Sequence, residues 1–171
     1  MATWIITDTH LNHGAMVKYF GRPEDYQERI RNHWLAKVAP GDRMIHLGDV
    51  IFSRAADLTE FLDSLPATKE LVRGNHDRQR DHWYLDHGFS SVQEFLVIGQ
   101  IYLTHKPASF LPPGCKLNIH GHLHTDIHRL EEFAGVHPQS WHRLLAIECT
   151  DYSPVLLDEF IRTPGHFQGD L

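Results

Sequence analysis

The sequence predicts an α/β fold, and two patterns support this expectation. In the first half of the chain, short apolar runs alternate with segments of helical periodicity in the order β-α-β-α-β-α, which predicts parallel strands with helices packed on the sheet. Short polar motifs directly follow several of these runs, where α/β proteins carry their functional side chains. The 171 residues contain no repeat or long linker, so we expect a single domain over residues 1–171, with a mobile tail over residues 163–171.

The first half of the chain is expected to contain three strands and three helices. The expected strands cover residues 3–7, 43–47 and 70–73. The expected helices cover residues 23–38, 54–65 and 78–87. In the first helix, apolar residues recur every four positions from Tyr26 to Val38. Ser53 is the expected N-cap of the second helix, Pro66 ends it, and Gly88 follows the third.

The second half of the chain is expected to be richer in strands. These strands cover residues 91–98, 100–104, 117–120 and 144–148. Gly99 separates the first two, so we expect a hairpin turn there. Residues 106–116 are rich in proline and are expected to form a loop, and residues 157–161 a short terminal helix.

Composition narrows the classes of function. The formal net charge is −6, which argues against a broad basic surface for duplex DNA or for anionic membranes. The 15 histidines nearly equal the 16 lysines and arginines, an excess that favours metal or acid–base chemistry. Two cysteines do not form a disulfide framework, and we find neither a signal peptide nor an apolar span long enough for a membrane. We therefore expect a soluble cytoplasmic protein without a membrane partner.

Five short motifs carry side chains that can bind metal ions. They are Asp8-Thr9-His10, Gly48-Asp49, Gly74-Asn75-His76-Asp77, Thr104-His105 and Gly121-His122-Leu123-His124. Two carboxylates, one amide oxygen and four imidazoles suffice to hold two divalent cations. Alternate residues of an extended segment point to the same side, so Asp8 and His10 are expected to reach one metal ion. His122 and His124 form a chelating pair of the same spacing.

Each motif also has an ordinary explanation when it is taken alone. Gly, Asn and Asp are favoured in turns, and a lone histidine such as His105 is more often structural. Seven candidate ligands at five expected strand ends favour a single common cause, which is a metal centre. His76 stands beside the expected centre without needing to be a ligand. Asp77 is expected to accept a hydrogen bond from His76 and to raise the pKa of its imidazole.

The ordered motifs resemble those of the calcineurin-like metallophosphoesterase superfamily. The resemblance is strongest to its small bacterial and phage phosphoesterases, which open with Asp-Thr-His-x-x-His, as residues 8–13 do here. It spans nearly the whole chain and implies a four-layer α/β/β/α sandwich of two mixed sheets flanked by helices. It implies that one metal is held by Asp8, His10, Asp49 and His124. It implies that the other is held by Asp49, Asn75, His105 and His122, with Asp49 as the bridge.

A dinuclear centre of this kind predicts hydrolysis of phosphate esters. A hydroxide that bridges the metals attacks phosphorus in line, and His76 is the candidate acid that protonates the leaving group. Oxygen and imidazole ligands suit Mn²⁺, Fe²⁺, Ni²⁺ or Zn²⁺, and the resemblance favours Mn²⁺. Asn12, His13 and Arg22 are candidate contacts to the substrate, and each also fits a solvated or structural role.

The substrate class is less constrained than the chemistry. The chain has little room for the large cap domains of longer superfamily members, so we expect a phosphodiesterase that acts on a nucleotide or a single-stranded nucleic-acid end. A phosphomonoesterase, including a protein phosphatase, is the alternative. A metal-bound scaffold without catalysis is a third hypothesis, disfavoured because the Asn75-His76-Asp77 motif is complete.

Overall fold

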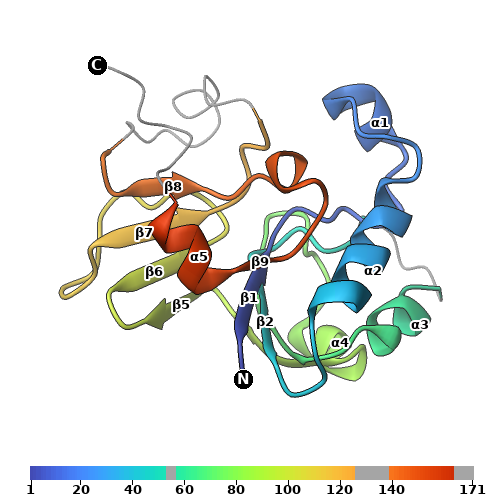
Figure 1. The fold of residues 1–171 in the computed structure, drawn as a ribbon, viewed down its shortest axis with the longest axis horizontal. Helices are drawn as coiled ribbons and strands as arrows, with labels where there is room; N and C mark the ends of the chain where they lie inside the picture. Colours follow the sequence, from blue (N-terminus) through green and yellow to red (C-terminus); the bar gives the residue numbers. More distant parts are fainter. Residues whose placement is uncertain (53–56, 126–138, 164–171) are drawn as a thin grey trace.

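The computed structural model describes residues 1–52, 57–125 and 139–163. These residues form an α/β protein with two mixed sheets and five helices (Figure 1). The first sheet has the strand order β4-β3-β2-β1-β9. Its strands are β1 (Thr3–Ile6), β2 (Arg43–His46), β3 (Thr68–Val72), β4 (Phe89–Gln93) and β9 (Val155–Leu156). All neighbours in this sheet are parallel except β9, which runs antiparallel to β1.

The second sheet has the strand order β5-β6-β7-β8. Its strands are β5 (Phe95–Ile98), β6 (Ile101–Thr104), β7 (Leu117–His120) and β8 (His142–Leu144). The β5–β6 pair is an antiparallel hairpin whose turn contains Gly99, with a φ of 57°, as expected. The β6–β7 and β7–β8 pairs are parallel.

The helices are short, apart from one that lies along the first sheet. They are α1 (Ala15–Phe20), α2 (Tyr26–Lys37), α3 (Asp57–Ser64), α4 (Asp81–Asp86) and α5 (Leu157–Arg162), with a 3-10 turn η2 (Ile147–Thr150). The apolar stripe of α2 is buried at Tyr26, Ile30 and Trp34, and Val38 ends the helix by turning to an extended conformation. None of the helices in the described ranges is long and apolar enough to cross a membrane.

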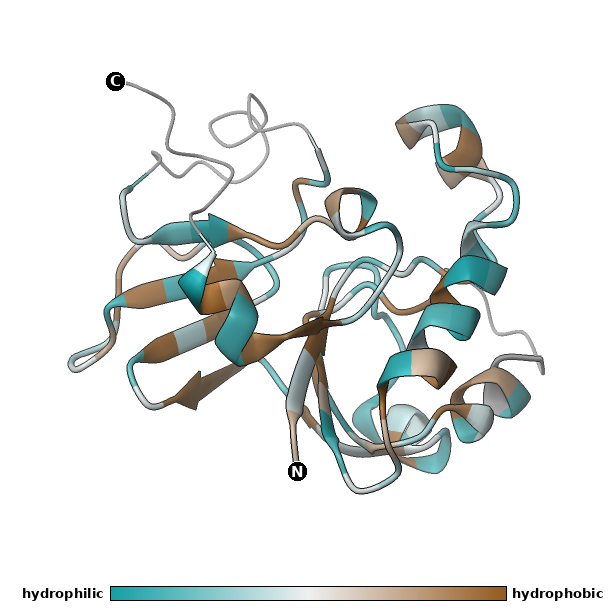
Figure 2. Cartoon of the chain, viewed as in Figure 1, coloured by the Kyte–Doolittle hydropathy of each residue, from teal (hydrophilic) through white to brown (hydrophobic). Residues whose placement is uncertain are grey.

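Alternating side chains of the first sheet join it to two different layers. Ile5 packs with Leu103 and Ile119 of the second sheet, whereas Ile6 packs with Trp34 of α2 on the opposite face. A third cluster joins β3 to α3 and α4 through Leu71. Helices, first sheet and second sheet therefore follow one another as layers. In Figure 2 the strands carry much of the brown apolar colour, and α2 is largely teal.

Three expectations about elements are corrected by the structure. Residues 91–98 are not one strand, because β4 ends at Gln93 in the first sheet and β5 begins at Phe95 in the second. Residues 144–148 are not a strand: β8 ends at Leu144 and η2 begins at Ile147. Helix α1 lies in a segment for which no helix was expected. The expected Ser53 cap and tail residues 164–171 fall outside the described residues.

Candidate metal centre

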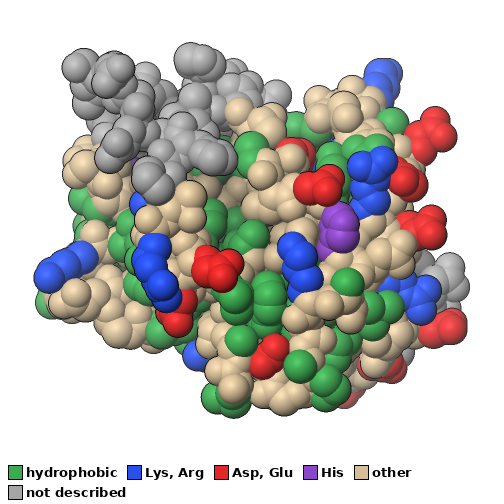
Figure 3. Space-filling view, viewed as in Figure 1, with side chains coloured by type: hydrophobic (Ala, Val, Ile, Leu, Met, Phe, Trp, Pro, Cys, Tyr) green, Lys and Arg blue, Asp and Glu red, His purple; other side chains and the backbone are tan. Residues whose placement is uncertain are grey.

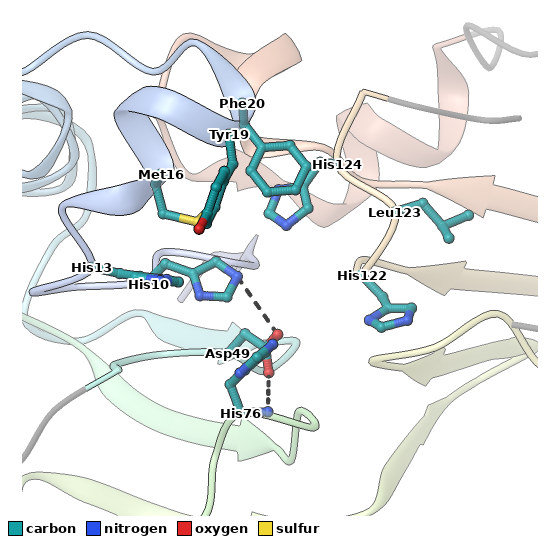
Figure 4. Close-up of a pocket in the computed structure, with 10 residues that line it drawn as sticks. All are labelled: His10, His13, Met16, Tyr19, Phe20, Asp49, His76, His122, Leu123 and His124. Atoms are coloured by element: carbon teal, nitrogen blue, oxygen red, sulfur yellow. Dashed lines mark hydrogen bonds and ion pairs between the residues drawn. The ribbon is translucent and has the colours of Figure 1, made fainter. Parts of the chain in front are cut away.

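The candidate ligands lie on five loops that follow the carboxyl ends of strands. These strands are β1, β2 and β3 of the first sheet and β6 and β7 of the second. Parallel strands bring their carboxyl ends to the same edge of a sheet, and the two sheets pack face to face through their shared apolar cluster. The sequence order of the motifs thus becomes one spatial cluster, part of which is drawn in Figure 4.

The ligand loops are not extended. Asp8, His10, Asp49, His122 and His124 all have a left-handed backbone, with φ between 44° and 72°. The expectation that Asp8 and His10 converge because an extended chain alternates is therefore wrong, although the two side chains do converge. Non-glycine residues in such conformations cost of order 1–3 kcal/mol each. Strain of this kind persists only where the surrounding packing holds it in place, and it is typical of functional sites.

Motif glycines allow the loops to approach one another closely. A Cβ atom on Gly74 would collide with the carboxylate and backbone nitrogen of Asp49, and one on Gly48 would collide with the backbone of Gly74. A Cβ atom on Gly121 would collide with the carboxylate of Asp8. Close packing therefore requires the glycine in each of these three motifs: Gly74 and Gly121 abut ligand carboxylates, and Gly48 abuts the Gly74 backbone and the His105 ring.

The first candidate group consists of Asp8, His10 and His124. One ligand atom from each lies within 4.8 Å of the others. The Oδ1 atom of Asp8 and both ring nitrogens of His10 are buried without a hydrogen-bond partner in the described part of the chain. Burying unpaired polar atoms costs free energy, and a cation held between them would remove that cost. The group therefore fits a metal ion.

The second candidate group consists of Asp49, His105 and His122, again with ligand atoms within 4.8 Å of one another. Asn75 belongs with it, because its Oδ1 atom lies 2.9 Å from Nε2 of His105. Asp49 also reaches the first group: its Oδ2 atom lies 3.4 Å from Nε2 of His105 and 3.6 Å from Nε2 of His10. One carboxylate oxygen thus stands between the two groups.

Burial and neighbouring charges shift the pKa values of the cluster in both directions. Burial lowers the pKa of His10 to about 2 and that of His122 to about 4, so both rings are neutral and keep a lone pair. Burial raises the pKa of Asp8. Burial acts against ionised Asp49, but the hydrogen bond and charge of His105 hold the pKa of Asp49 well below its usual range. Burial also opposes a charged His105, but the hydrogen bond that its ring donates to Asp49 and the charges of Asp8 and Asp49 raise its pKa to about 9, so a cation at this site would replace a ring proton.

The role expected for Asp77 differs from the one that the structure describes. Its Oδ2 atom accepts the backbone N–H groups of Asp49 and Gly74, each at 2.8 Å, and its Oδ1 atom accepts that of Val50 at 3.0 Å. No hydrogen bond recorded for the described residues joins Asp77 to the ring of His76. Asp77 therefore clamps the loop after β2 to the loop after β3 rather than orienting His76.

The structure also corrects the role expected for Arg22 as a substrate contact. Its side chain is buried, with 1% exposed, and lines neither described cavity. Its guanidinium donates to the backbone oxygens of Asp8 and Thr9 at 2.8 and 3.2 Å. It also donates to Oε1 of Glu148 at 2.9 and 2.7 Å. Arg22 therefore braces the first ligand loop from behind.

Glu148 is a functional residue that the sequence reading missed. Its Oε1 atom lies 2.9 Å from Nδ1 of His124, which places the proton on Nδ1 and leaves Nε2 for a cation. Burial opposes its charge, but the hydrogen bond from His124 and the charge of Arg22 lower the pKa of Glu148 to about 2. The signal was present, because Glu148 is an acidic residue directly after an apolar run, like the other carboxylates of the centre.

A cavity of about 260 Å³ opens beside the cluster. Figure 4 shows His10, Asp49, His122 and His124 around it, with His13 and His76 at its side. His76 is thus brought next to the ligands, and its backbone N–H donates to Oδ1 of Asp49 at 2.8 Å. Asn12 is exposed and lines neither described cavity. A second cavity of about 300 Å³ borders the second group at Asn75, His105 and Lys106.

Comparisons with known proteins show the fold and no more. No protein-family model matches the chain. It is 29% identical to the uncharacterised protein MJ1445 of Methanocaldococcus jannaschii, over 93% of this chain and 89% of the other. The crystal structure of AQ665, a protein of unknown function from Aquifex aeolicus, is similar with a TM-score of 0.74 and 23% identity, over 94% of this chain and 97% of that one. The nuclease MPE of Pseudomonas putida is similar with a TM-score of 0.54 and 24% identity, over 71% of this chain and 61% of that one.

Proposed function

We propose that the chain is a metal-dependent phosphoesterase of the calcineurin-like metallophosphoesterase superfamily, of the small bacterial and phage type. Support comes from the complete set of motifs, the two candidate metal groups and the nuclease among the proteins of similar fold. The fourth, helical layer outside the second sheet and a cytoplasmic location belong to this proposal as predictions.

The observation that carries the proposal is the position of Asp49. Its Oδ2 atom stands between Nε2 of His10 and Nε2 of His105, as a carboxylate shared by two cations would. Asp8, His10, Asp49 and His124 would hold one cation. Asp49, Asn75, His105 and His122 would hold the other, with Mn²⁺ as the first candidate for both and Fe, Ni or Zn as alternatives.

When bound, two such cations supply Lewis-acid polarisation of the phosphoryl group and a water of lowered pKa for in-line attack. The chain supplies the leaving-group proton. His76 is our candidate for this general acid, because its ring lies 5.4 Å from the ring of His10, centroid to centroid, beside the open cavity. Its backbone hydrogen bond to Asp49 fixes it relative to the ligands.

His76→Ala should leave metal binding intact and lower turnover of a phosphodiester with a poor leaving group. A general acid contributes about 10²–10⁴-fold, so kcat should fall by that factor, whereas a p-nitrophenyl ester, which needs little protonation, should lose much less. Steady-state rates on both esters check this. Equal losses on the two would contradict the assigned role.

A phosphodiester is the favoured substrate class. The cluster is bordered by one cavity at His10 and His124 and by another at Asn75 and His105, so each of the two substituents of a diester has a space beside the phosphate. We therefore propose a nucleotide or a single-stranded nucleic-acid end as the substrate. Figure 3 shows acidic and basic side chains of the described residues interspersed over one face, so this face does not present the broad basic surface that favours duplex binding.

The proposal is tested by a screen of phosphomonoesters and phosphodiesters with added Mn²⁺, run beside Asp49→Asn. The variant keeps the shape of the shared carboxylate but loses its charge, so it should lose most activity. Activity that survives in Asp49→Asn would identify a contaminant. Preference for monoesters would favour the phosphatase alternative, and Mn²⁺ binding without hydrolysis of any ester would favour a non-catalytic scaffold.

A further inference from the structure

Helix α1 forms an aromatic wall over the candidate centre. Met16, Tyr19 and Phe20 line the same cavity as the ligands (Figure 4). The ring of Phe20 lies on His124 with 3.9 Å between centroids, so this wall is in direct contact with the first group. Tyr19 is 65% exposed and its ring points into the cavity above His10. In Figure 1 α1 projects beyond α2 at the edge of the molecule.

A second aromatic surface stands at the side of the cavity. His13, which lines the cavity, stacks on Phe52 with centroids 3.9 Å apart and planes inclined by 6°. Phe52 is 55% exposed, and its ring lies 6.1 Å from that of His76. Two flat, accessible ring surfaces, Tyr19 and the Phe52–His13 pair, therefore adjoin the place where a phosphate would bind.

The exposure of these rings beside the cavity suggests that they contact a ligand. Tyr19 lines the polar cavity and is exposed, and Phe52 is exposed and stacks on His13 of the same cavity. Exposed aromatic rings beside a phosphate site are the side chains on which bases stack. The adjoining space, about 260 Å³, is slightly below the roughly 300–1,000 Å³ of sites for drug-sized ligands. It suits one planar ring system rather than a duplex.

We propose that Tyr19 and the stacked Phe52–His13 pair form a subsite for one unpaired nucleobase, attached to the phosphate that the metal centre binds. Aromatic side chains stack on any base because every base has a π-face, so such a subsite selects a nucleotide without reading its sequence. This inference rests on the proposed function and adds to it the part of the substrate that gives specificity.

The test compares two esters with the same leaving group. Thymidine 5′-(p-nitrophenyl phosphate) carries a base, and methyl p-nitrophenyl phosphate does not. Stacking on one aromatic side chain is worth about 5- to 150-fold. The ratio of kcat/KM for the thymidine ester to that for the methyl ester should fall by about this factor in Tyr19→Ala and in Phe52→Ala, and by less in Tyr19→Phe, which keeps the ring.

Phe95→Ala is the matched control. Phe95 has the same side chain and nearly the same exposure as Phe52, 51% against 55%. It lies on β5 and its ring contacts Tyr102, whereas Phe52 stacks on the cavity-lining His13. Substitutions of exposed side chains outside a site usually change stability little. The ratio for Phe95→Ala should equal that of the parent chain.

A binding experiment separates the subsite from the chemistry. Calorimetry on the Mn²⁺-loaded chain should show AMP binding more tightly than ribose 5-phosphate, and Tyr19→Ala and Phe52→Ala should remove this difference. Hydrolysis of neither ester would overturn the proposed function and leave the subsite to this measurement. Equal binding of the two ligands, or an unchanged ester ratio in both variants, would overturn the subsite even if the chain proves to be a phosphodiesterase.

Discussion

At the scale of single residues, Glu148 connects parts of the centre that are far apart in sequence. Its Oε1 atom accepts from Arg22, which braces Asp8 and Thr9, and from His124 of the loop after β7. A carboxylate that orients a ligating histidine fixes its tautomer and raises its basicity. The free energy of metal binding should therefore depend on Glu148 even though it faces away from the cavity.

Glu148→Ala should weaken binding of Mn²⁺ by about 10- to 100-fold, the usual effect of removing the partner of a ligating histidine. Glu148→Gln leaves Arg22 equally without a counter-charge but keeps an oxygen that can accept the Nδ1–H of His124, so it should recover most of the affinity. Calorimetric titration of both variants with Mn²⁺ measures the difference. Equal losses would show that the contact with Arg22, not the one with His124, is what matters.

At the scale of elements, the loops after β2 and β3 behave as one unit. Asp77 clamps their backbones together, and glycines allow the contact. Gly74 is the tightest of these positions, because a Cβ atom there would enter the space of the Asp49 carboxylate. A single methyl group at this point should therefore move the shared ligand.

Gly74→Ala should lower the free energy of unfolding by about 1–3 kcal/mol, the usual cost of overpacking, and should weaken Mn²⁺ binding with it. Gly14→Ala is the control: nothing lies within 4 Å of a Cβ atom there, and its φ of −56° suits alanine. Urea denaturation and Mn²⁺ titration measure the two effects. A Gly74→Ala chain that matches Gly14→Ala in both would show that the loops can move apart freely.

Asp42 joins the starts of β1 and β2 and gives the fold a pH dependence. Hydrogen bonds from the backbone of Ala2, the indole of Trp4 and the backbone of Ala39 lower the pKa of Asp42 below its usual 3.8. A lowered pKa in the folded chain stabilises it above pH 3.8, and this stability is lost as the pH falls through the folded-state value. The free energy of unfolding should therefore fall less steeply below pH 3.8 in Asp42→Asn. Parallel curves for the two chains would contradict this.

Sequence patterns predicted the elements that depend on local periodicity. Helix α2, strand β7 and the Gly99 turn lie where the apolar spacing and turn residues put them. The sequence could not show that residues 91–98 form two strands, because the alternation of side chains is the same whether the chain stays in one sheet or crosses to another. Helix α1 was missed because its six residues are too short to show a helical period.

The candidate site was likewise predictable in part: its residues could be identified from the sequence, but not all of their roles. The motifs identified the side chains that the structure groups together, because ligand chemistry restricts residue types. The roles of Asp77 and Arg22 were misjudged because burial is set by tertiary packing. The sequence does not reveal that the hydrogen-bond partners of both side chains are backbone groups of distant loops.

At the scale of the whole molecule, the proposed metal binding should be coupled to folding. The centre joins both sheets, and it contains buried unpaired ligand atoms and five left-handed residues. Cations that bind only the folded chain stabilise it by mass action, by about 2.7 kcal/mol at 100 times the Kd. At about 2–4 °C per kcal/mol for a chain of this size, Mn²⁺ should raise the Tm by about 5–11 °C.

Calorimetric scans with Mn²⁺ and with EDTA test this coupling, and Asp49→Asn should show a much smaller rise. The variant separates site binding from the general effect of a divalent salt, because its surface is otherwise unchanged. A rise of equal size in both chains would mean that the ions act elsewhere than at the centre.

The pairing of β9 with β1 gives this molecule an order of assembly during translation. Domains tend to fold from the N-terminus as they are synthesised, but here the first strand of the sheet waits for Val155 and Leu156 to cover its open edge. Glu148 is also made late, long after His10 and Asp49. The candidate ligands are all made once His124 is made, but the carboxylate that orients His124 and the strand that covers β1 come later. The centre should therefore reach its final form only after Leu156 has been made.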